Sequence, residues 1–182
     1  NLTIVPNAAV DAVLFDDAAA CGVRTVNGDE FAARHVILAC GAYGSPAVLM
    51  RSGIGPGEHL TSHGIEVLVD AQGVGARLMD HPSVLVSSRM NVAATPPSAF
   101  RIARVETITK WRSSQVQDGY DVHIISHGTV HQPDGSWALV FRPYLEYSRS
   151  MGTVRLTTAD PQGPLNIDHR YLTEEGDLEA LV

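Results

Sequence analysis

The chain has 182 residues, of which 45% are hydrophobic, and it carries a formal net charge of −7 at pH 7. This is enough apolar sequence for one domain, or parts of two, with a buried core. The acidic balance and the lack of a basic cluster argue against nucleic acid or an anionic membrane surface as partner. No run reaches the roughly 18 apolar residues of a membrane-spanning helix. Cys21 and Cys40 show neither disulfide nor metal-ligand spacing, which favours a reducing compartment, and we expect the cytoplasm.

The beginning of the chain contains short runs rich in β-forming residues, separated by turn signals. These runs cover residues 2–5, 9–15 and 21–26. Asn27 and Gly28 form a favoured hairpin turn that leads into residues 30–34. The pattern predicts a small antiparallel meander.

Residues 36–55 combine a buried strand pattern with a helix start. The apolar run 36–40, closed by Gly41, predicts a strand covered on both faces. Ser45 suits an N-cap and Pro46 the first helical position, which predicts a helix over residues 45–52. Such a turn can point helix N–H donors and the positive end of the helix dipole at an anion. It is equally common as a packing turn, and the denser glycine spacing of a phosphate loop is absent.

Shorter elements follow this stretch. We expect one or two helical turns over residues 56–63 and a buried strand over residues 65–69. Gly73 and Gly75 then allow a sharp turn or a close approach of the backbone to a ligand.

The second half of the chain changes from a helical to a β period. Ile102, Val105 and Ile108 lie three apart, which predicts a surface helix over residues 100–111. From residue 121 the side chains alternate with period two, as in a strand. Further strands are expected over 137–145, 153–157 and 165–167, with turns at 133–135 and 160–163, and a final helix after Thr173.

Several of these motifs resemble the glucose-methanol-choline (GMC) family of FAD-dependent alcohol oxidoreductases. The family's second signature matches Gly41, Ala42, Ser45, Pro46, Val48, Leu49, Ser52, Gly53, Ile54 and Gly55. Residues 39–41 resemble the Ala-x-Gly turn of many flavoproteins, and residues 148–161 resemble a Ser-Arg-Gly segment of the family. Residues 73–82 resemble the family's Gly-Val-Gly-x-Asn-Leu-x-Asp-His segment, with Arg77 in place of the asparagine.

The resemblance implies a mixed α/β and α+β fold. Residues 1–83 would form the later part of a Rossmann-like FAD-binding domain with a β-meander, and residues 84–182 an incomplete substrate-binding domain with an antiparallel sheet. It further implies FAD contacts at Val10, Ala39, Cys40 and Gly41. Without the resemblance, Val10 would be an ordinary strand valine.

The activity implied by the resemblance is hydride transfer from an alcohol to flavin, which gives an aldehyde or ketone. The family's Gly-x-Gly-x-x-Gly fingerprint would precede this stretch, and its catalytic histidine would follow Val182. We therefore expect no catalytic residue here, and a stretch that by itself neither holds FAD firmly nor turns over an alcohol. A hydroxynitrile lyase of the same family and a non-catalytic binding domain remain as alternatives. The small-molecule alcohol and the electron acceptor stay open.

Histidines on the predicted strand after residue 121 are the remaining chemical candidates. We interpret His123, Ile125 and His127 as candidate substrate-pocket residues. His123, His127 and His131 also suggest a metal, but their spacing along one strand and the absence of a nearby cysteine favour no metal site. Asp80 and His81 are adjacent in an extended segment and would point to opposite sides, so we interpret them as structural rather than as an acid–base pair.

Overall fold

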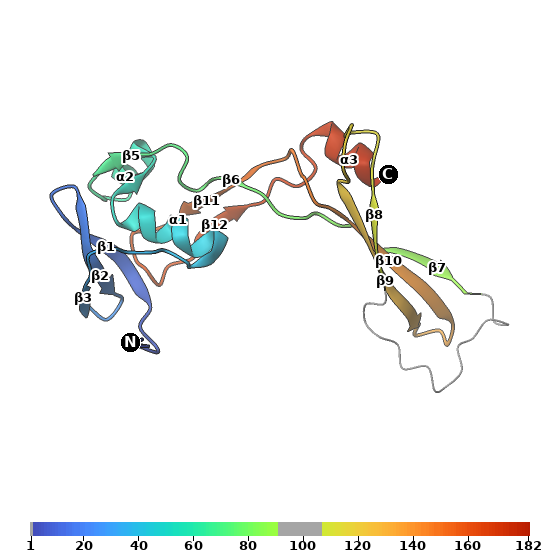
Figure 1. The fold of residues 1–182 in the computed structure, drawn as a ribbon, viewed down its shortest axis with the longest axis horizontal. Coiled ribbons are helices and arrows are strands. Elements are labelled where there is room, and N and C mark those ends of the chain that lie inside the picture. The colour runs from blue at the N-terminus through green and yellow to red at the C-terminus, as the bar shows by residue number, and fades with distance from the viewer. Residues whose placement is uncertain (1, 91–106) are drawn as a thin grey trace. The chain divides into compact units, whose positions relative to one another are not determined.

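The computed structural model describes residues 2–90 and 107–182. The chain divides into two compact units, each of which is considered by itself (Figure 1). Unit 1 comprises Asn1–Leu78 and Met151–His169, and unit 2 comprises Met79–Ser150 and Arg170–Val182. Helices and several separate sheets make the fold mixed α/β, as predicted. The domain boundary at residue 84 stays a prediction.

Unit 1 begins with the expected meander. It consists of β1 (Val10–Asp16), β2 (Ala19–Thr25) and β3 (Glu30–Ala32), paired antiparallel in the order β1-β2-β3. The hairpin turn holds Gly28 at a φ of 90°, a conformation that favours glycine. The predicted strand over residues 2–5 was wrong, because this segment pairs with no strand among the described residues and leaves Leu2 85% exposed.

Helix α1 (Gly41–Arg51) starts earlier than predicted. Ser45 is not its N-cap; the Ser45 hydroxyl instead accepts a hydrogen bond of 3.1 Å from the N–H of Cys40, and Pro46 lies inside the helix. The strand predicted over residues 36–40 was also wrong. That run is not paired with any strand in the part of the chain that the structure describes, and Ile37 is 88% exposed. An apolar run forms a buried strand only where a partner strand and a covering layer exist.

A short helix and a parallel strand pair follow α1. Helix α2 (Gly57–Ser62) confirms the predicted helical turns and is followed by Gly64 at a φ of 70°. Strand β4 (Ile54–Gly55) pairs with β5 (Val69–Asp70), so the strand predicted over 65–69 is present only at its end and is exposed. The core between the helices contains Ala47, Met50, Leu60 and Leu156.

The second sheet of unit 1 combines β6 (Ala76–Leu78) with β11 (Gly152–Leu156) and β12 (Leu165–Asp168), in the order β12-β11-β6. Gly75 shows the close backbone approach that the sequence indicates. It has a φ of 66°, its carbonyl accepts a hydrogen bond of 2.7 Å from the N–H of Val154, and a Cβ there would collide with the carbonyl of Val154. Glycine is therefore required on both conformational and steric grounds.

Unit 2 is built on a four-stranded antiparallel sheet in the order β7-β10-β9-β8. Its strands are β7 (Val86–Arg89), β8 (Thr107–Trp111), β9 (Val122–His131) and β10 (Trp137–Leu145). The helix predicted over 100–111 was wrong for its last five residues, which form β8 opposite β9; residues 100–106 lie outside the described residues. The β-branched Thr107, Ile108 and Thr109 suit a pleated strand better than a helix.

Helix α3 (Glu175–Leu181) completes unit 2 and is fixed by a buried carboxylate. Asp177 is only 2% exposed and accepts hydrogen bonds from the Ser148 hydroxyl and from the N–H groups of Arg149 and Ser150, at 2.7, 2.8 and 2.7 Å. The helix is thereby tied to the loop after β10. Within the described residues, no helix has the length and apolar character that crossing a membrane requires.

Candidate functional site

A cavity in unit 1 brings together two of the residues expected to contact a nucleotide. Val10, at the start of β1, and Cys40, directly before α1, line the same cavity of about 410 Å³. Ala39 and Gly41 flank Cys40 in the chain but are not among the lining residues. The remaining lining residues are Ala8, Gly44, Ala47, Val48, Arg51, Pro161, Gly163 and Leu165. The volume lies within the usual range of small-molecule sites.

One face of α1 forms much of this cavity. Gly44, Ala47, Val48 and Arg51 follow the i, i+3, i+4, i+7 spacing of a single helix face. Gly44 makes the approach of helix and turn possible, because a Cβ there would lie 2.8 Å from the Cβ of Cys40. Sequence reasoning did not assign this face to the site, although the spacing of small residues along the helix could have indicated it.

The charges around the cavity favour an anionic group near the start of α1. The first turn of α1 contains no acidic residue, so no carboxylate of that turn competes for its N–H groups or for the positive end of the helix dipole. At the other end of the helix, Nε of Arg51 lies 3.0 Å from Oδ1 of Asp11. Asp11 also pairs with Arg24 at 2.8 Å. The carboxylate of Asp11 thus fixes the guanidinium of Arg51, which lines the cavity.

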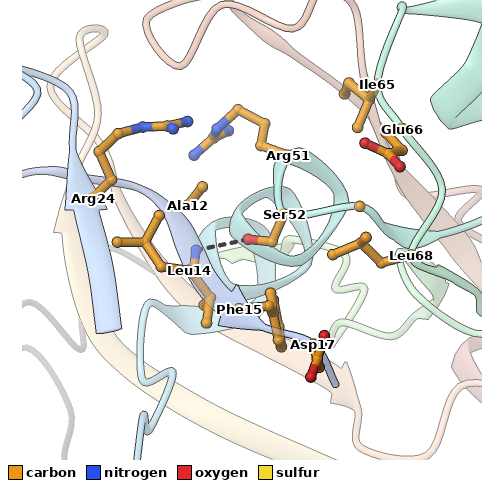
Figure 2. Close-up of a pocket in the computed structure, with 12 residues that line it drawn as sticks. Ala12, Leu14, Phe15, Asp17, Arg24, Arg51, Ser52, Ile65, Glu66 and Leu68 are labelled. Atoms are coloured by element: carbon orange, nitrogen blue, oxygen red, sulfur yellow. Dashed lines mark hydrogen bonds between the residues drawn. The ribbon is translucent and has the colours of Figure 1, made fainter. Parts of the chain in front are cut away.

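Ser52 of the signature has a structural role in this unit. Figure 2 shows a second cavity, of about 300 Å³, which is lined by residues of β1 and by the residues that follow α1. The dashed line in this view is the bond of 2.8 Å from the Val13 N–H to the Ser52 hydroxyl. The same hydroxyl donates to the carbonyl of Val48 at 2.6 Å. Ser52 therefore links the end of α1 to β1, and both of its hydrogen bonds within the described residues are made to backbone groups rather than to a base that could activate a nucleophile.

The candidate substrate-pocket residues lie on β9 in unit 2. Nδ1 of His123 lies 2.8 Å from Oε1 of Glu146, and the ring of His123 stacks on Tyr120 at 5.2 Å. Nε2 of His123 and Nε2 of His127 are both buried and have no hydrogen-bond partner among the described residues. Ile125 lies between them in the strand, opposite Arg142 of β10. Glu146 was missed by sequence reasoning, since a single glutamate after a strand carries no local signal.

Asp80 and His81 are engaged with other residues of unit 2. Asp80 accepts hydrogen bonds from the N–H of His81, at 2.8 Å, and from the hydroxyl of Tyr171. Nδ1 of His81 lies 3.7 Å from the second oxygen of Glu146. Glu146 consequently stands between His81 and His123, while the structural role of Asp80 and His81 stays a prediction.

The absence of a metal site at the histidines of β9 stays a prediction. Among the residues that the structure describes, no group of three or more histidine, cysteine, aspartate or glutamate residues is arranged to hold a metal ion. The side chain of His131 lies outside the described residues. Nδ1 of His123 is engaged by Glu146, which is the partner that fixes its ring.

Comparisons with known proteins agree with the motifs. Residues 1–83 match the family model described as GMC oxidoreductase. An oxygen-dependent choline dehydrogenase of Burkholderia multivorans is 44% identical over 206 residues, covering 97% of this chain and 36% of that protein. A choline oxidase of Arthrobacter globiformis is 30% identical over 203 residues, covering the whole of this chain and 36% of that protein. The chain thus spans about a third of the length of these relatives.

Solved structures show the same fold. A formate oxidase of Aspergillus oryzae, determined in work on FAD modification, superposes with a TM-score of 0.79 at 24% identity, covering 98% of this chain and 41% of that one. The family match supports FAD as the cofactor. The sequence motifs, the family model and the relatives agree, and the chain belongs to the GMC oxidoreductase family.

Proposed function

We propose that this chain forms part of the FAD-binding domain and part of the substrate-binding domain of an alcohol oxidoreductase. The observation that carries the proposal is the cavity of unit 1, where Val10 and Cys40 meet beside the start of α1. FAD, when bound, supplies a hydride acceptor, so that an alcohol is converted to an aldehyde or ketone. The complete protein, rather than this stretch alone, would carry out the reaction.

The residues present fit a nucleotide in the unit 1 cavity. Gly44 and Ala47 are small enough to admit a planar group against the helix. Val10 and Cys40 also line the cavity and would hold the adenine end of FAD, while the backbone of Ala39 and Gly41 turns the chain beside Cys40. The unopposed N–H groups at the start of α1 suit a phosphate oxygen.

The face of β9 that carries His123 and His127 is proposed to contact the alcohol. Because Glu146 only accepts a hydrogen bond when ionised, its contact with Nδ1 of His123 places a proton on Nδ1 and leaves a lone pair on Nε2 of the neutral ring. Nε2 can then accept a hydrogen bond from a hydroxyl group. Ile125 supplies an apolar surface between the two histidines. A polar acceptor beside an apolar wall suits a small alcohol.

The proposal is tested with the intact protein by filling the cavity. Ala8 lines the cavity and Ala9 beside it does not, so Ala8→Trp and Ala9→Trp form a matched pair. Ala8→Trp should weaken FAD binding roughly tenfold or more, equivalent to about 1.4 kcal/mol of binding free energy, and Ala9→Trp should leave it unchanged.

FAD binding and the reaction are measured separately. Flavin absorbance and titration with FAD report binding, and anaerobic bleaching of the flavin by an alcohol reports hydride transfer. An intact protein that binds no FAD, or equal FAD affinity in the two variants, would contradict the proposed site. Cyanide release from a cyanohydrin without an electron acceptor would instead identify a lyase.

A further inference from the structure

Two histidines, His59 of α2 and His63 at the C-cap of that helix, hold both polar backbone groups of a single residue of β11. The N–H of Leu156 donates to Nε2 of His59 at 3.2 Å, and Nε2 of His63 lies 2.9 Å from the carbonyl oxygen of Leu156. The two rings lie four residues apart on the helix and meet edge to face, with centroids separated by 4.6 Å. We call His59 and His63 together the histidine clip.

The histidine clip completes an edge of the sheet that, within the described residues, no strand covers beside Leu156. On this edge β6 pairs with Gly152 and Thr153, and the N–H of Val154 donates to the carbonyl of Gly75. Leu156 is the next residue whose backbone groups point to the same edge. A backbone N–H and C=O that lose water must find other partners, and the two imidazoles provide them.

The direction of the two bonds fixes the protonation state of each ring. A carbonyl oxygen only accepts, so Nε2 of His63 carries its proton and donates. A backbone N–H only donates, so Nε2 of His59 carries a lone pair and its ring is neutral, with the proton on Nδ1. Protonation of His59 removes that lone pair and sets two N–H groups against each other. Protonation of His59 does not remove the bond that His63 donates to the carbonyl of Leu156.

The surroundings of His59 keep it neutral near pH 7. Burial, followed by the neighbouring His63 and by Arg155 of β11, lowers the pKa of His59 below its ordinary value. Two carboxylates belong to the adjoining elements: Glu58 precedes His59 in α2, and Asp70 of β5 accepts a bond of 2.9 Å from the N–H of Gly57. Since the unfolded chain binds the proton more readily, the stabilisation is complete above the ordinary pKa and decreases as the pH falls toward the lowered one.

The histidine clip is connected to the unit 1 cavity through one strand pair and one core. Leu156 lies directly opposite Leu165 of β12, which lines the cavity. Leu156 also packs in the same core cluster as Ala47, which lines the cavity from α1. A shift of β11 away from α2 would therefore move two walls of the cavity.

We propose that the histidine clip is an acid-releasable positioning device, which holds β11 and β12 against α2 and thereby maintains the nucleotide cavity. The part of this proposal that concerns the nucleotide cavity rests on the proposed FAD site. The release of Leu156 by protonation of His59 is independent of that site. His59 and His63 are positioning residues, because they act on the cavity through Leu156.

The test uses the intact protein and hydrogen exchange at the amide of Leu156, corrected for the intrinsic rate. When the pH is lowered from about 7.5 to about 5, the opening equilibrium constant of this amide should rise roughly tenfold, as expected for the loss of about one hydrogen bond. His59→Gln keeps an acceptor that does not titrate, so the increase in exchange at low pH should disappear. His59→Phe keeps a ring without an acceptor and should exchange rapidly at both pH values. His35→Gln replaces an exposed histidine of the same unit and should behave as the parent.

FAD retention over the same pH range tests the part of the proposal that concerns the nucleotide cavity. The parent protein should lose FAD as the pH falls, and His59→Gln should retain it. Equal exchange of the Leu156 amide at both pH values, or an increase in exchange at low pH that persists in His59→Gln, would overturn the clip whether or not FAD binds. If exchange of the Leu156 amide increases at low pH as expected but FAD retention does not change, the positioning role would be overturned. A protein that binds no FAD would contradict the proposed function, and exchange would still decide the clip.

Discussion

Replacing Asp177 by asparagine should destabilise unit 2 by about 2–4 kcal/mol, because it breaks a buried set of charge-assisted hydrogen bonds. Oδ2 of Asp177 accepts from both the Ser148 hydroxyl and the Ser150 N–H, while Oδ1 accepts from the Arg149 N–H. In the variant, the amide nitrogen takes the place of one oxygen. If it replaces Oδ2, two bonds of about 1.5 kcal/mol or more each are lost and the Ser150 N–H is left unsatisfied.

The effect should depend on pH with a defined sign. Burial by itself raises the pKa of Asp177, but the hydrogen bonds from Ser150, Arg149 and Ser148 outweigh burial and lower the pKa below its ordinary value. The stabilisation is therefore complete above the unfolded pKa of about 3.9 and is lost as the pH falls through the lowered folded value. The gap between the parent and Asp177→Asn should be widest near neutral pH and should close in strong acid.

Urea unfolding of the intact protein measures this difference. Tryptophan fluorescence follows unit 2, to which Trp111 and Trp137 both belong. Asp118→Asn is the matched control, since Asp118 is exposed in the same unit and its replacement should change stability by no more than about 0.5 kcal/mol. The reasoning would be refuted if Asp177→Asn and Asp118→Asn were equally stable, or if the loss in Asp177→Asn were the same in acid as at neutral pH.

Two further predictions concern unit 1, and both are read by urea unfolding. Ser52→Ala leaves the buried N–H of Val13 without its acceptor and should cost about 1–3 kcal/mol, whereas Ser62→Ala removes only an exposed bond; equal losses would contradict the structural role of Ser52. Gly75→Ala introduces a collision with Val154 as well as a strained φ and should cost more than Gly28→Ala, which meets nothing within 4 Å. A larger loss for Gly28→Ala would contradict the close approach at Gly75.

The elements that could be predicted from sequence are those with local signals at both ends. Strand β10 is a dense apolar run that starts after a Pro-Asp-Gly turn, and its predicted bounds are confirmed. The meander was identified from its turn residues, and α2 from the glycine that follows it. Each of these elements has its partner nearby in sequence, so local pattern and tertiary structure agree.

The secondary-structure predictions were wrong where an element depends on a partner far away in sequence, or where the sequence fits both a helical and a strand periodicity. Residues 36–40 have a strand composition but are not paired with another strand in the described ranges, and composition alone cannot show this. Ile102, Val105 and Ile108, spaced three apart, suggested a helix that would run into β8, while the β-branched residues 107–109 at the start of β8 were the better guide. The start of α1 was misplaced because the N-cap rule favours a serine before a proline, whereas Ser45 bonds back to Cys40.

Only part of the candidate site could be predicted from the sequence, because some of its residues come from distant parts of the chain. The motif around Cys40 indicated one wall of the cavity, and helical spacing could have added the face of α1. Pro161, Gly163 and Leu165 reach the same cavity from more than a hundred residues further along the chain. No local pattern encodes that meeting, which arises from the packing of α1 against β11 and β12.

The orphan nitrogens on β9 provide the strongest physical argument for a site in unit 2. A buried polar atom without a partner costs about 1–3 kcal/mol, and among the described residues neither Nε2 of His123 nor Nε2 of His127 has one. Folds normally satisfy such atoms, and the exceptions concentrate at functional positions. Glu146 holds the other ring nitrogen of His123, Nδ1, at 2.8 Å and so fixes the orientation of the ring. A hydroxyl group that donates to Nε2 would remove the cost at His123, and this is the contact that an alcohol substrate can make.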